Sequence, residues 1–303
     1  MKVLIAKLGA TGDVVRSTPL VKRLGGHTVW LTEAKNQVLL DGLGEEIECL
    51  PWEKRDCIRE REYNLVINLE DTLEVSDFLR GINAETRFGA YADADGVLRY
   101  TDSSRAWFGL SLISIHGREE ADRLKLLNRR TYQDLIFSGL GLEFRGEKYL
   151  LPKPIETGLR GDVAIAADSG PVWPMKKWAY YDKLKERLEG HGLTVNLLPK
   201  RPLLLEHLAD VQNHRCLVGG DSLPMHFALG TGTPCVSLFT CTSPWEIYDY
   251  GVQEKIISPL LEEFFYKRGH KERATTAITL EEVLRAVMRQ LDRSTSADTV
   301  PAE

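Results

Sequence analysis

Short runs of apolar, often β-branched residues recur along the chain, and longer stretches with helical spacing separate them. This alternation is typical of a parallel sheet whose strands are buried by helices on both faces. We therefore predict an α/β fold. The expected strands are residues 2–7, 28–32, 47–50, 64–69, 163–167, 194–198, 216–218 and 235–239.

Apolar residues at spacings of about 3.6 predict the helices between these strands. The first expected helix spans residues 13–24 and is followed by Gly25, a common helix stop. The last spans residues 281–291 and follows a capping box made by Thr279 and Glu282. Further helices are expected at residues 131–140, 179–188, 203–211 and 224–229.

The chain has 303 residues, a length that suggests two domains of about 150 residues each. Residues 151–158 contain two prolines and a glycine, a composition that suits the interior of neither a helix nor a strand. We place the boundary there, with domains at 1–152 and 159–293 and a flexible tail at 294–303. Each domain is expected to be a doubly wound, Rossmann-like unit.

Composition narrows the class of protein. Thirty-nine Lys and Arg against 44 Asp and Glu give a formal charge of −5, which argues against a general binder of nucleic acid or anionic membranes. The longest apolar runs are far shorter than the ~20 residues of a membrane-spanning helix. The N-terminus lacks the pattern of a secretory signal, so a cytoplasmic location is expected.

Two features that mimic special chemistry are interpreted as ordinary structure. The five cysteines are odd in number and lack Cys-x-x-Cys spacing, so we expect free thiols, mostly buried. Asp93-Ala94-Asp95 mimics a metal-binding Asp-x-Asp motif, but it precedes a glycine in a polar stretch and is predicted to be a turn.

Loops that follow the expected strands are the candidates for chemistry, because ligands bind at the carboxyl ends of strands in open α/β sheets. The first loop, residues 8–13, combines a glycine-lined turn that includes Gly12 with Asp13 at the start of a helix. It lacks the spacing of a phosphate loop and the third glycine of a dinucleotide fingerprint. On the residues alone, helix capping by Asp13 is the favoured interpretation.

A second loop follows the strand at residues 216–218. Two glycines lead to Asp221 and Ser222, and a helix with Pro224 near its start comes next. Such a helix N-terminus presents free amides and could hold a diphosphate. Capping by Asp221 or Ser222 explains the pattern equally well, and His226 could be a hydrogen-bonded, partly buried imidazole.

A third loop, residues 168–178, places Ser169 and Gly170 in a turn before Lys176. The lysine could contact a phosphate. Lysines beside aromatic residues are common on protein surfaces, so this segment alone favours an ordinary loop.

Taken in order, the three loops resemble glycosyltransferase family 9, which includes the ADP-heptose:lipopolysaccharide heptosyltransferases. The matching elements are Gly-Asp-Val at 12–14, Lys-x-Trp at 176–178, and a long stretch that begins with Gly-Asp-Ser-x-Pro-Met-His at 220–226 and ends with Thr-Ser-Pro at 242–244. The resemblance extends over almost the whole chain, and residues 220–244 are its most specific part.

The resemblance implies a GT-B fold, in which two Rossmann-like domains face a central cleft. Residues 1–152 would bind the acceptor and residues 159–293 the nucleotide sugar. The implied reaction is an inverting transfer from an ADP-sugar without a metal cofactor. Asp13 lies at the position of the general base and Lys176 at that of the residue holding the leaving diphosphate. The other expected donor-binding residues are Gly12, Ser169, Gly170, Asp221, Ser222, Leu223, Pro224 and His226.

The implied acceptor is a glycan or lipid core, with at most peripheral membrane contact at the inner face of the inner membrane. Residues 99–130 contain seven basic and four acidic residues, an excess of +3 that suits an anionic acceptor. A solvated face of exchangeable ion pairs is the favoured interpretation. Two other functions stay open: an epimerase acting on nucleotide sugars, and a non-catalytic nucleotide-sugar-binding protein. Leu223, where relatives often have glycine, and the shortened second domain motivate the second.

Overall fold

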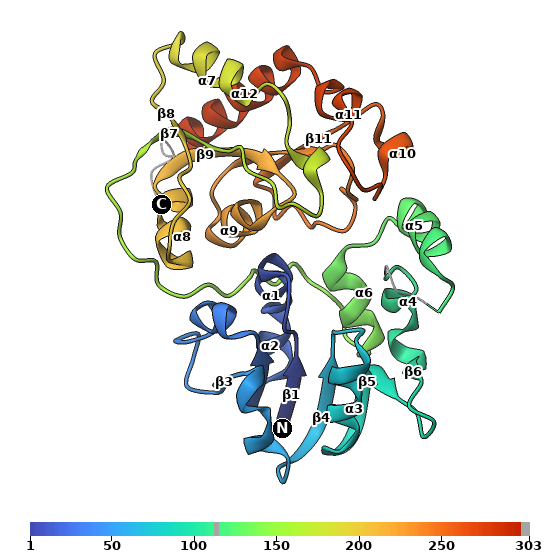
Figure 1. The fold of residues 1–303 in the computed structure, drawn as a ribbon. Helices are drawn as coiled ribbons and strands as arrows, with labels where there is room; N and C mark the ends of the chain where they lie inside the picture. The colour runs from blue at the N-terminus through green and yellow to red at the C-terminus, as the bar shows by residue number, and fades with distance from the viewer. Residues whose placement is uncertain (112–114, 298–303) are drawn as a thin grey trace. The chain divides into compact units, whose positions relative to one another are not determined.

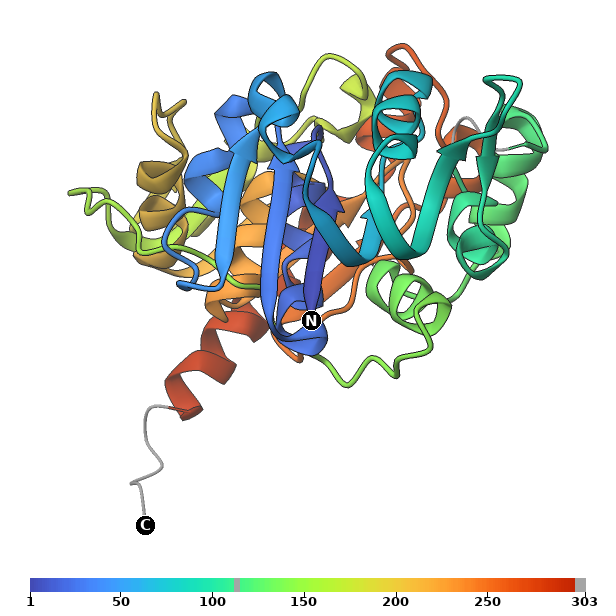
Figure 2. The same ribbon diagram turned by 90° about the horizontal axis from the view of Figure 1, so that it is seen from below.

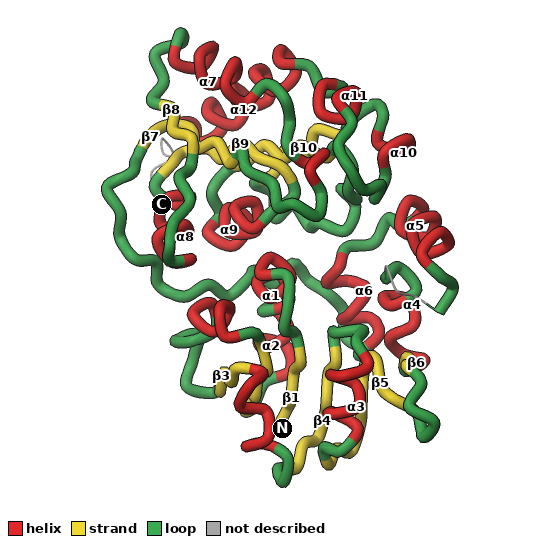
Figure 3. Tube along the Cα trace, in the orientation of Figure 1, coloured by secondary structure: helices red, strands yellow, loops and turns green. Residues whose placement is uncertain are grey.

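The structure is a computed structural model that describes residues 1–111 and 115–297, with side chains described as far as residue 293. The chain divides into two compact units, Met1–Pro152 and Lys153–Glu303, and the division falls within the proline-containing segment 151–158. Strands and helices alternate along both units (Figures 1 and 3). The predicted α/β class is confirmed.

The N-terminal unit is built on a six-stranded sheet with the order β3-β2-β1-β4-β5-β6. Five strands are parallel, and β6 pairs antiparallel with β5 at one edge. Figure 2 shows the blue strands of this unit lying side by side. The strands are β1 (Lys2–Ala6), β2 (His27–Thr32), β3 (Ile47–Pro51), β4 (Glu62–Asn68), β5 (Asn83–Ala92) and β6 (Leu98–Tyr100).

Side chains alternate between the two faces of the sheet along each strand. Both faces carry apolar side chains, and helices cover both. Val3 and Ile5 on β1 pack with residues of α1, α2 and α6, whereas Leu4 and Ala6 pack with residues of α3. The helices are α1 (Thr11–Ser17), α2 (Pro19–Leu24), α3 (Leu73–Arg80), α4 (Arg105–Phe108), α5 (Arg118–Leu127) and α6 (Tyr132–Gly139), with 3-10 helices η1 (Ala34–Leu39), η2 (Trp52–Ile58) and η3 (Asp102–Ser104).

The expected single helix at residues 13–24 is two helices, α1 and α2, which meet at Thr18. Pro19 explains the break, since it has no N–H to continue the helical ladder and its ring clashes with the preceding turn. The same residue is well placed as the first residue of α2. Asp13 consequently belongs to a seven-residue helix that begins at Thr11.

The C-terminal unit contains an all-parallel, five-stranded sheet with the order β11-β10-β9-β7-β8. Its largest core lies between the sheet and two helices, α7 and α12, where Trp178 is fully buried. Helices α8 and α9 cover the other face (Figure 1). The strands are β7 (Gly161–Ala166), β8 (Val195–Leu197), β9 (His214–Gly220), β10 (Cys235–Phe239) and β11 (Gln253–Ile257).

The predicted capping box begins the last helix, where Thr279 Oγ1 accepts the N–H of Glu282 at 3.3 Å. This helix continues to Ala297, beyond the expected start of the tail, and residues 298–303 lie outside the described part of the chain. The helices of this unit are α7 (Tyr181–Glu189), α8 (Leu204–Gln212), α9 (Leu223–Thr231), α10 (Leu261–Phe264), α11 (Glu272–Thr276) and α12 (Leu280–Ala297), with the 3-10 helix η4 (Pro174–Lys176).

The sequence pattern did not predict the strands β5, β6 and β11. β11 and the first half of β5 begin with mostly polar and charged residues, Gln-Glu-Lys and Asn-Ala-Glu-Thr-Arg, and these residues are only partly buried or exposed. Within residues 1–111 and 115–297, every helix is too short or too polar to cross a lipid bilayer.

Candidate active site

Asp13 lies in the first turn of α1 with cations on two sides. Its Oδ1 is 2.9 Å from Arg16 Nη2, one turn along the same helix, and its Oδ2 is 3.9 Å from Lys7 Nζ. The side chain of Asp13 keeps 30% exposure, more than either cation. The residue at the helix cap is Ala10, whose φ of 52° lies in the left-handed region and turns the loop into α1. Asp13 is therefore an ion-paired and accessible carboxylate rather than the capping residue.

The loop before α1 lies where the strand order of the sheet reverses, because β1 pairs with β2 on one side and β4 on the other. Ligands of doubly wound folds bind at such switch points. Lys7 follows β1 and Glu70 follows β4, and their side chains meet at 2.7 Å. Burial alone would lower the pKa of Lys7, but the carboxylates of Asp13 and Glu70 outweigh it and raise this pKa, so the lysine is charged.

Tyr132 of α6 contacts Arg16 and Ser17 of α1. The guanidinium of Arg16 lies 3.9 Å from the centre of the Tyr132 ring, and the Tyr132 hydroxyl is 2.7 Å from Ser17 Oγ. Burial raises the pKa of Tyr132 to about 12, so the phenol is neutral. The ring and the carboxylate together hold Arg16 in one orientation.

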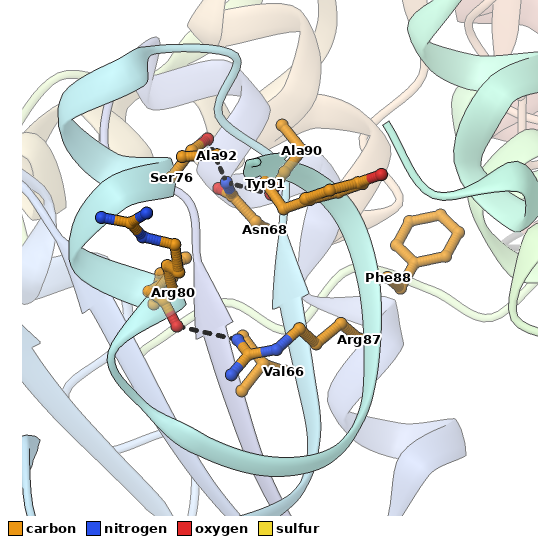
Figure 4. Close-up of a pocket in the computed structure, with 10 residues that line it drawn as sticks. Val66, Asn68, Ser76, Arg80, Arg87, Phe88, Ala90, Tyr91 and Ala92 are labelled. Atoms are coloured by element: carbon orange, nitrogen blue, oxygen red, sulfur yellow. Dashed lines mark hydrogen bonds between the residues drawn. The ribbon is translucent and has the colours of Figure 1, made fainter. Parts of the chain in front are cut away.

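A small hollow of about 80 Å³ lies beside the end of β4, between α3 and β5 (Figure 4). Asn68 Nδ2 donates to Ser76 Oγ at 3.2 Å and to the Ala90 carbonyl at 2.8 Å, and Arg87 donates to the carbonyl of Leu79 near the end of α3. The volume of this hollow is well below the ~300 Å³ of a typical ligand pocket, so we interpret the hollow as a packing feature and not as a ligand site.

Lys176 and Asp221 are paired in the C-terminal unit. Lys176 Nζ donates to Asp221 Oδ2 at 2.9 Å and to the Asp221 carbonyl at 2.7 Å. Two of the three N–H donors of the ammonium are therefore used by one residue. Gly220 allows this approach, because a Cβ at that position would lie 3.1 Å from the Lys176 carbonyl oxygen.

The start of α9 opens onto a hollow of about 500 Å³, which we call the α9 hollow. This volume is in the range of nucleotide-sized ligand pockets. Four of the predicted donor-binding residues line it: Gly170, Ser222, Leu223 and Pro224. Ser222 is the N-cap of α9, and its side chain makes no capping hydrogen bond, so the first amides of the helix are not covered by it.

The other predicted donor-binding residues, Lys176 and Asp221 included, are not among the described lining of this hollow. Ser169 lines a second hollow of about 630 Å³ on the α7 side of the same loop. His226 is buried within α9, and neither lining includes it among the described residues. Gly12 lies in α1 beside Asp13, in the N-terminal unit.

Residues outside the predicted donor-binding set complete the α9 hollow. Lys200, Arg201 and His207 line it from the segment after β8 and from α8. Arg201 makes a bidentate pair with Asp210, with nitrogen–oxygen distances of 2.6 and 2.9 Å, and Asp210 is fully buried. The sequence gives little indication of the Arg201–Asp210 pair, since an arginine nine residues before an aspartate is an ordinary spacing.

The interpretation of Asp93 as a turn residue is confirmed. Asp93 Oδ1 accepts the N–H groups of Asp95 and Val97, and these hydrogen bonds, that of Val97 first, lower the pKa of Asp93 together with Arg99. In the part of the chain that the structure describes, no three metal-ligating side chains cluster. All five cysteines are free thiols, three of them buried.

The basic residues at 99–130 are largely engaged with neighbouring carboxylates. Most of these pairs join residues three to six positions apart, and their side chains are largely exposed. The pairs are Arg99 with Asp93, Arg105 with Asp102, Arg118 with Asp122, Arg123 with Glu120, and Arg130 with Asp134.

Comparison with known proteins relates this geometry to a family. The family model described as glycosyltransferase family 9 (heptosyltransferase) matches residues 168–274, which include Lys176, Asp221 and the start of α9. A search of curated protein sequences gives no significant match.

Solved structures match over nearly the whole chain. A family 9 glycosyl transferase from Veillonella parvula has 15% identity and a TM-score of 0.67, covering 96% of this chain and 97% of its own. Escherichia coli heptosyltransferase WaaC, solved with ADP-2-deoxy-2-fluoro heptose, has 13% identity and a TM-score of 0.63, covering 95% and 99%. TibC, an iron-containing dodecameric glycosyltransferase from enterotoxigenic E. coli, has 15% identity and a TM-score of 0.59, covering 97% and 77%.

The two-unit α/β architecture expected for a GT-B fold is therefore confirmed by its structural neighbours. Residues 168–274 match the family 9 heptosyltransferase model, which confirms the predicted resemblance, and the solved structures show that the chain shares the fold of these glycosyltransferases.

Proposed function

We propose that this chain is an inverting, metal-independent glycosyltransferase that moves a heptose, or a related sugar, from an ADP-sugar to a hydroxyl of a glycan or lipid-core acceptor, as in lipopolysaccharide core assembly. The observation that carries the proposal is the family 9 match over residues 168–274, which contains Lys176 and the α9 start. The binding of an ADP-heptose analogue to WaaC supports the same class of donor.

In this proposal the C-terminal unit binds the donor. The nucleotide occupies the α9 hollow, and its diphosphate lies at the first amides of α9, where the helix dipole favours negative charge. Lys176, held by Asp221, uses its third N–H donor for a phosphate oxygen. Both groups stabilise the negative charge that grows on ADP as it leaves.

The N-terminal unit binds the acceptor and supplies the base. Asp13 takes the proton of the acceptor hydroxyl as its oxygen bonds to the anomeric carbon. The bond from that carbon to the diphosphate oxygen breaks in the same step, and ADP leaves from the opposite face with the electron pair. A carboxylate can do this at neutral pH because the proton leaves only as the new bond forms.

Metal independence is part of the proposal, because Lys176 and the amides of α9 supply the positive field that a divalent cation would otherwise supply. TibC is described as iron-containing, so the test includes metal explicitly. The proposed location is the cytoplasm, at the inner face of the inner membrane where a lipid-core acceptor would be met.

Calorimetry with ADP and UDP, with and without a chelator, tests donor binding, and incubation of ADP-heptose with a panel of glycan and lipid-core acceptors tests transfer. ADP binding and sugar transfer in the presence of chelator are expected. Loss of binding on chelation would overturn the metal-free mechanism, and a preference for UDP would overturn the donor. Binding of ADP-heptose without transfer to any acceptor would favour the non-catalytic alternative.

A further inference from the structure

Two positively charged side chains lie near Asp13, although a general base needs no cation beside it. Arg16 and Lys7 face it with two positive charges, from α1 and from the end of β1. Tyr132 faces it from α6 and is neutral because burial raises its pKa to about 12. Glu33, next to η1, lies beside Gly9 and pairs with Lys35. Two cations beside one carboxylate favour its charged form and weaken it as a base.

Glu70 offsets one of these cations. Its Oε1 accepts from Lys7 Nζ at 2.7 Å, while Lys7 Nζ is 3.9 Å from Asp13 Oδ2. The ammonium is therefore within hydrogen-bond distance of Glu70 and beyond it from Asp13. The side chains of Lys7 and Glu70 are 9% and 15% exposed, so solvent screens their interaction only weakly.

The same oxygen also shapes the loop that leads to α1. Glu70 Oε1 accepts the backbone N–H groups of Leu8 at 2.8 Å and Gly9 at 3.2 Å. Glu70 is in turn fixed from behind, because its own N–H donates to Asn68 Oδ1 at 3.0 Å. The amide of Asn68 is buried and held by Ser76 and Ala90, as Figure 4 shows. Glu70 is thus anchored on β4 and reaches across to β1.

We propose that Glu70 is a positioning residue that sets the basicity of Asp13 by holding Lys7 away from it and neutralising the charge of Lys7. This rests on the proposed function, in which Asp13 accepts the proton of the acceptor. With Glu70 present, the charge of Lys7 is offset and Arg16 is the main cation that Asp13 faces. Without it, Lys7 has Asp13 as its nearest carboxylate and draws the proton-accepting oxygen into an ion pair.

The proposal predicts shifts of opposite sign for two substitutions. Glu70→Gln keeps an oxygen that can accept from Lys7, Leu8 and Gly9, so the loop is retained and only the charge is removed. Asp13 should then titrate at a lower pH. Lys7→Met removes a cation from Asp13, which should then titrate at a higher pH. In Lys7→Met/Glu70→Gln both charges are absent, and titration should return close to that of the unsubstituted chain.

The experiment is NMR titration of the carbon-13-labelled Asp13 side chain in the full chain, together with the pH dependence of transfer from ADP-heptose. We expect shifts of about half a pH unit or more in each single variant. The acid limb of the rate profile should move in the same directions, with kcat of Glu70→Gln about two- to threefold lower and KM for the donor unchanged. Glu74→Gln, an exposed carboxylate on α3, is the matched control and should shift neither profile.

An unshifted Asp13 titration in Glu70→Gln, or one shifted upward, overturns the proposal, as does a loss of melting temperature with an unchanged pH profile. If Lys7→Met fails to fold around an uncompensated Glu70, the double variant and Glu70→Gln still decide the question. Absence of transfer by the unsubstituted chain would count against the proposed function instead, because the NMR titration needs no substrate.

Discussion

Asp13 and Arg16 lie one turn apart on α1 and form an ion pair of 2.9 Å, with the guanidinium stacked on the ring of Tyr132. This pair fixes the direction of the carboxylate that we assign as the base. A carboxylate that only capped the helix would not need a cation on its own helix face. The assignment of Asp13 can therefore be tested by a substitution that removes the charge of the side chain and keeps its shape.

Asp13→Asn keeps the shape of the side chain but removes its capacity to take a proton. Transfer from the ADP-sugar should fall by about 10²–10⁴, while affinity for ADP should barely change, because the donor is assigned to the other unit. Turnover and ADP affinity are the measurements. If Asp13 is only structural, Asp13→Asn transfers sugar at a near-normal rate and Asp13→Ala lowers stability by about 0.3–1 kcal/mol, the contribution of a first-turn carboxylate and its partly exposed ion pair.

Lys176→Ala should weaken ADP binding by about tenfold or more, since it removes a charge-assisted contact worth about 1.5–3 kcal/mol. It also leaves the Asp221 carboxylate without its lysine at the proposed diphosphate site. Isothermal calorimetry measures the change, and Lys177→Ala is the control, because Lys177 is the exposed neighbour. Equal losses in the two variants would show that the effect is one of general surface charge.

Arg201 is predicted to stabilise the fold through Asp210. Asp210 is fully buried and also accepts from Thr157 Oγ1 at 2.6 Å, so removal of the guanidinium leaves a buried charge uncompensated. Arg201→Met should lower the free energy of unfolding by about 3–5 kcal/mol. Urea denaturation measures this.

The neighbouring residue provides the control for that measurement. Lys200 pairs with Asp168 at 3.5 Å, and its side chain is 88% exposed. Lys200→Met should change stability by less than about 1 kcal/mol, as exposed pairs do. A similar small effect for Arg201→Met, in an otherwise unchanged protein, would mean that Asp210 is adequately stabilised by Thr157 and the backbone.

Local sequence signals predicted the parts of the candidate site that are local in the chain. Lys176 and the start of α9 follow strands that apolar runs mark clearly, and Gly220 before Asp221 is explained by the close approach of Lys176. The break at Thr18 was missed because apolar periodicity continues through it, although Pro19 is visible in the sequence. Hydrophobic spacing outweighed the proline in that prediction.

The partners of Asp13 could not be found in the same way. Lys7 and Glu70 are 63 positions apart, and they meet only because β1 and β4 are neighbours in the sheet. Strand order is set by how the helices cover both faces, which no single segment encodes. The usable signal was that Lys7 ends one expected strand and Glu70 directly follows another, which places both residues at the same edge of a parallel sheet.

His214 makes the stability of the C-terminal unit depend on pH. Its Nδ1 lies 2.6 Å from the Asp210 carbonyl and its Nε2 lies 3.0 Å from the Asn196 amide nitrogen, an arrangement that fits a neutral ring with the proton on Nδ1. Burial lowers the pKa of His214 below its usual value of 6.5, despite the opposing effect of the Asp210 carbonyl. The pKa of His207, on α8, is lowered in the same way, again because its ring is buried.

Because these folded-state pKa values lie below 6.5, the unfolded chain binds more protons than the folded chain as the pH falls through that value. The stabilisation is fully present above pH 6.5 and is lost progressively below it. Urea unfolding at several pH values between about 7.5 and 5 should therefore show a falling free energy of unfolding. His207→Gln/His214→Gln should flatten this dependence, whereas the substitution of the exposed His191 by Gln should leave the slope as it is. A slope unchanged in the double variant would assign the pH dependence to other groups and exclude these histidines as its cause.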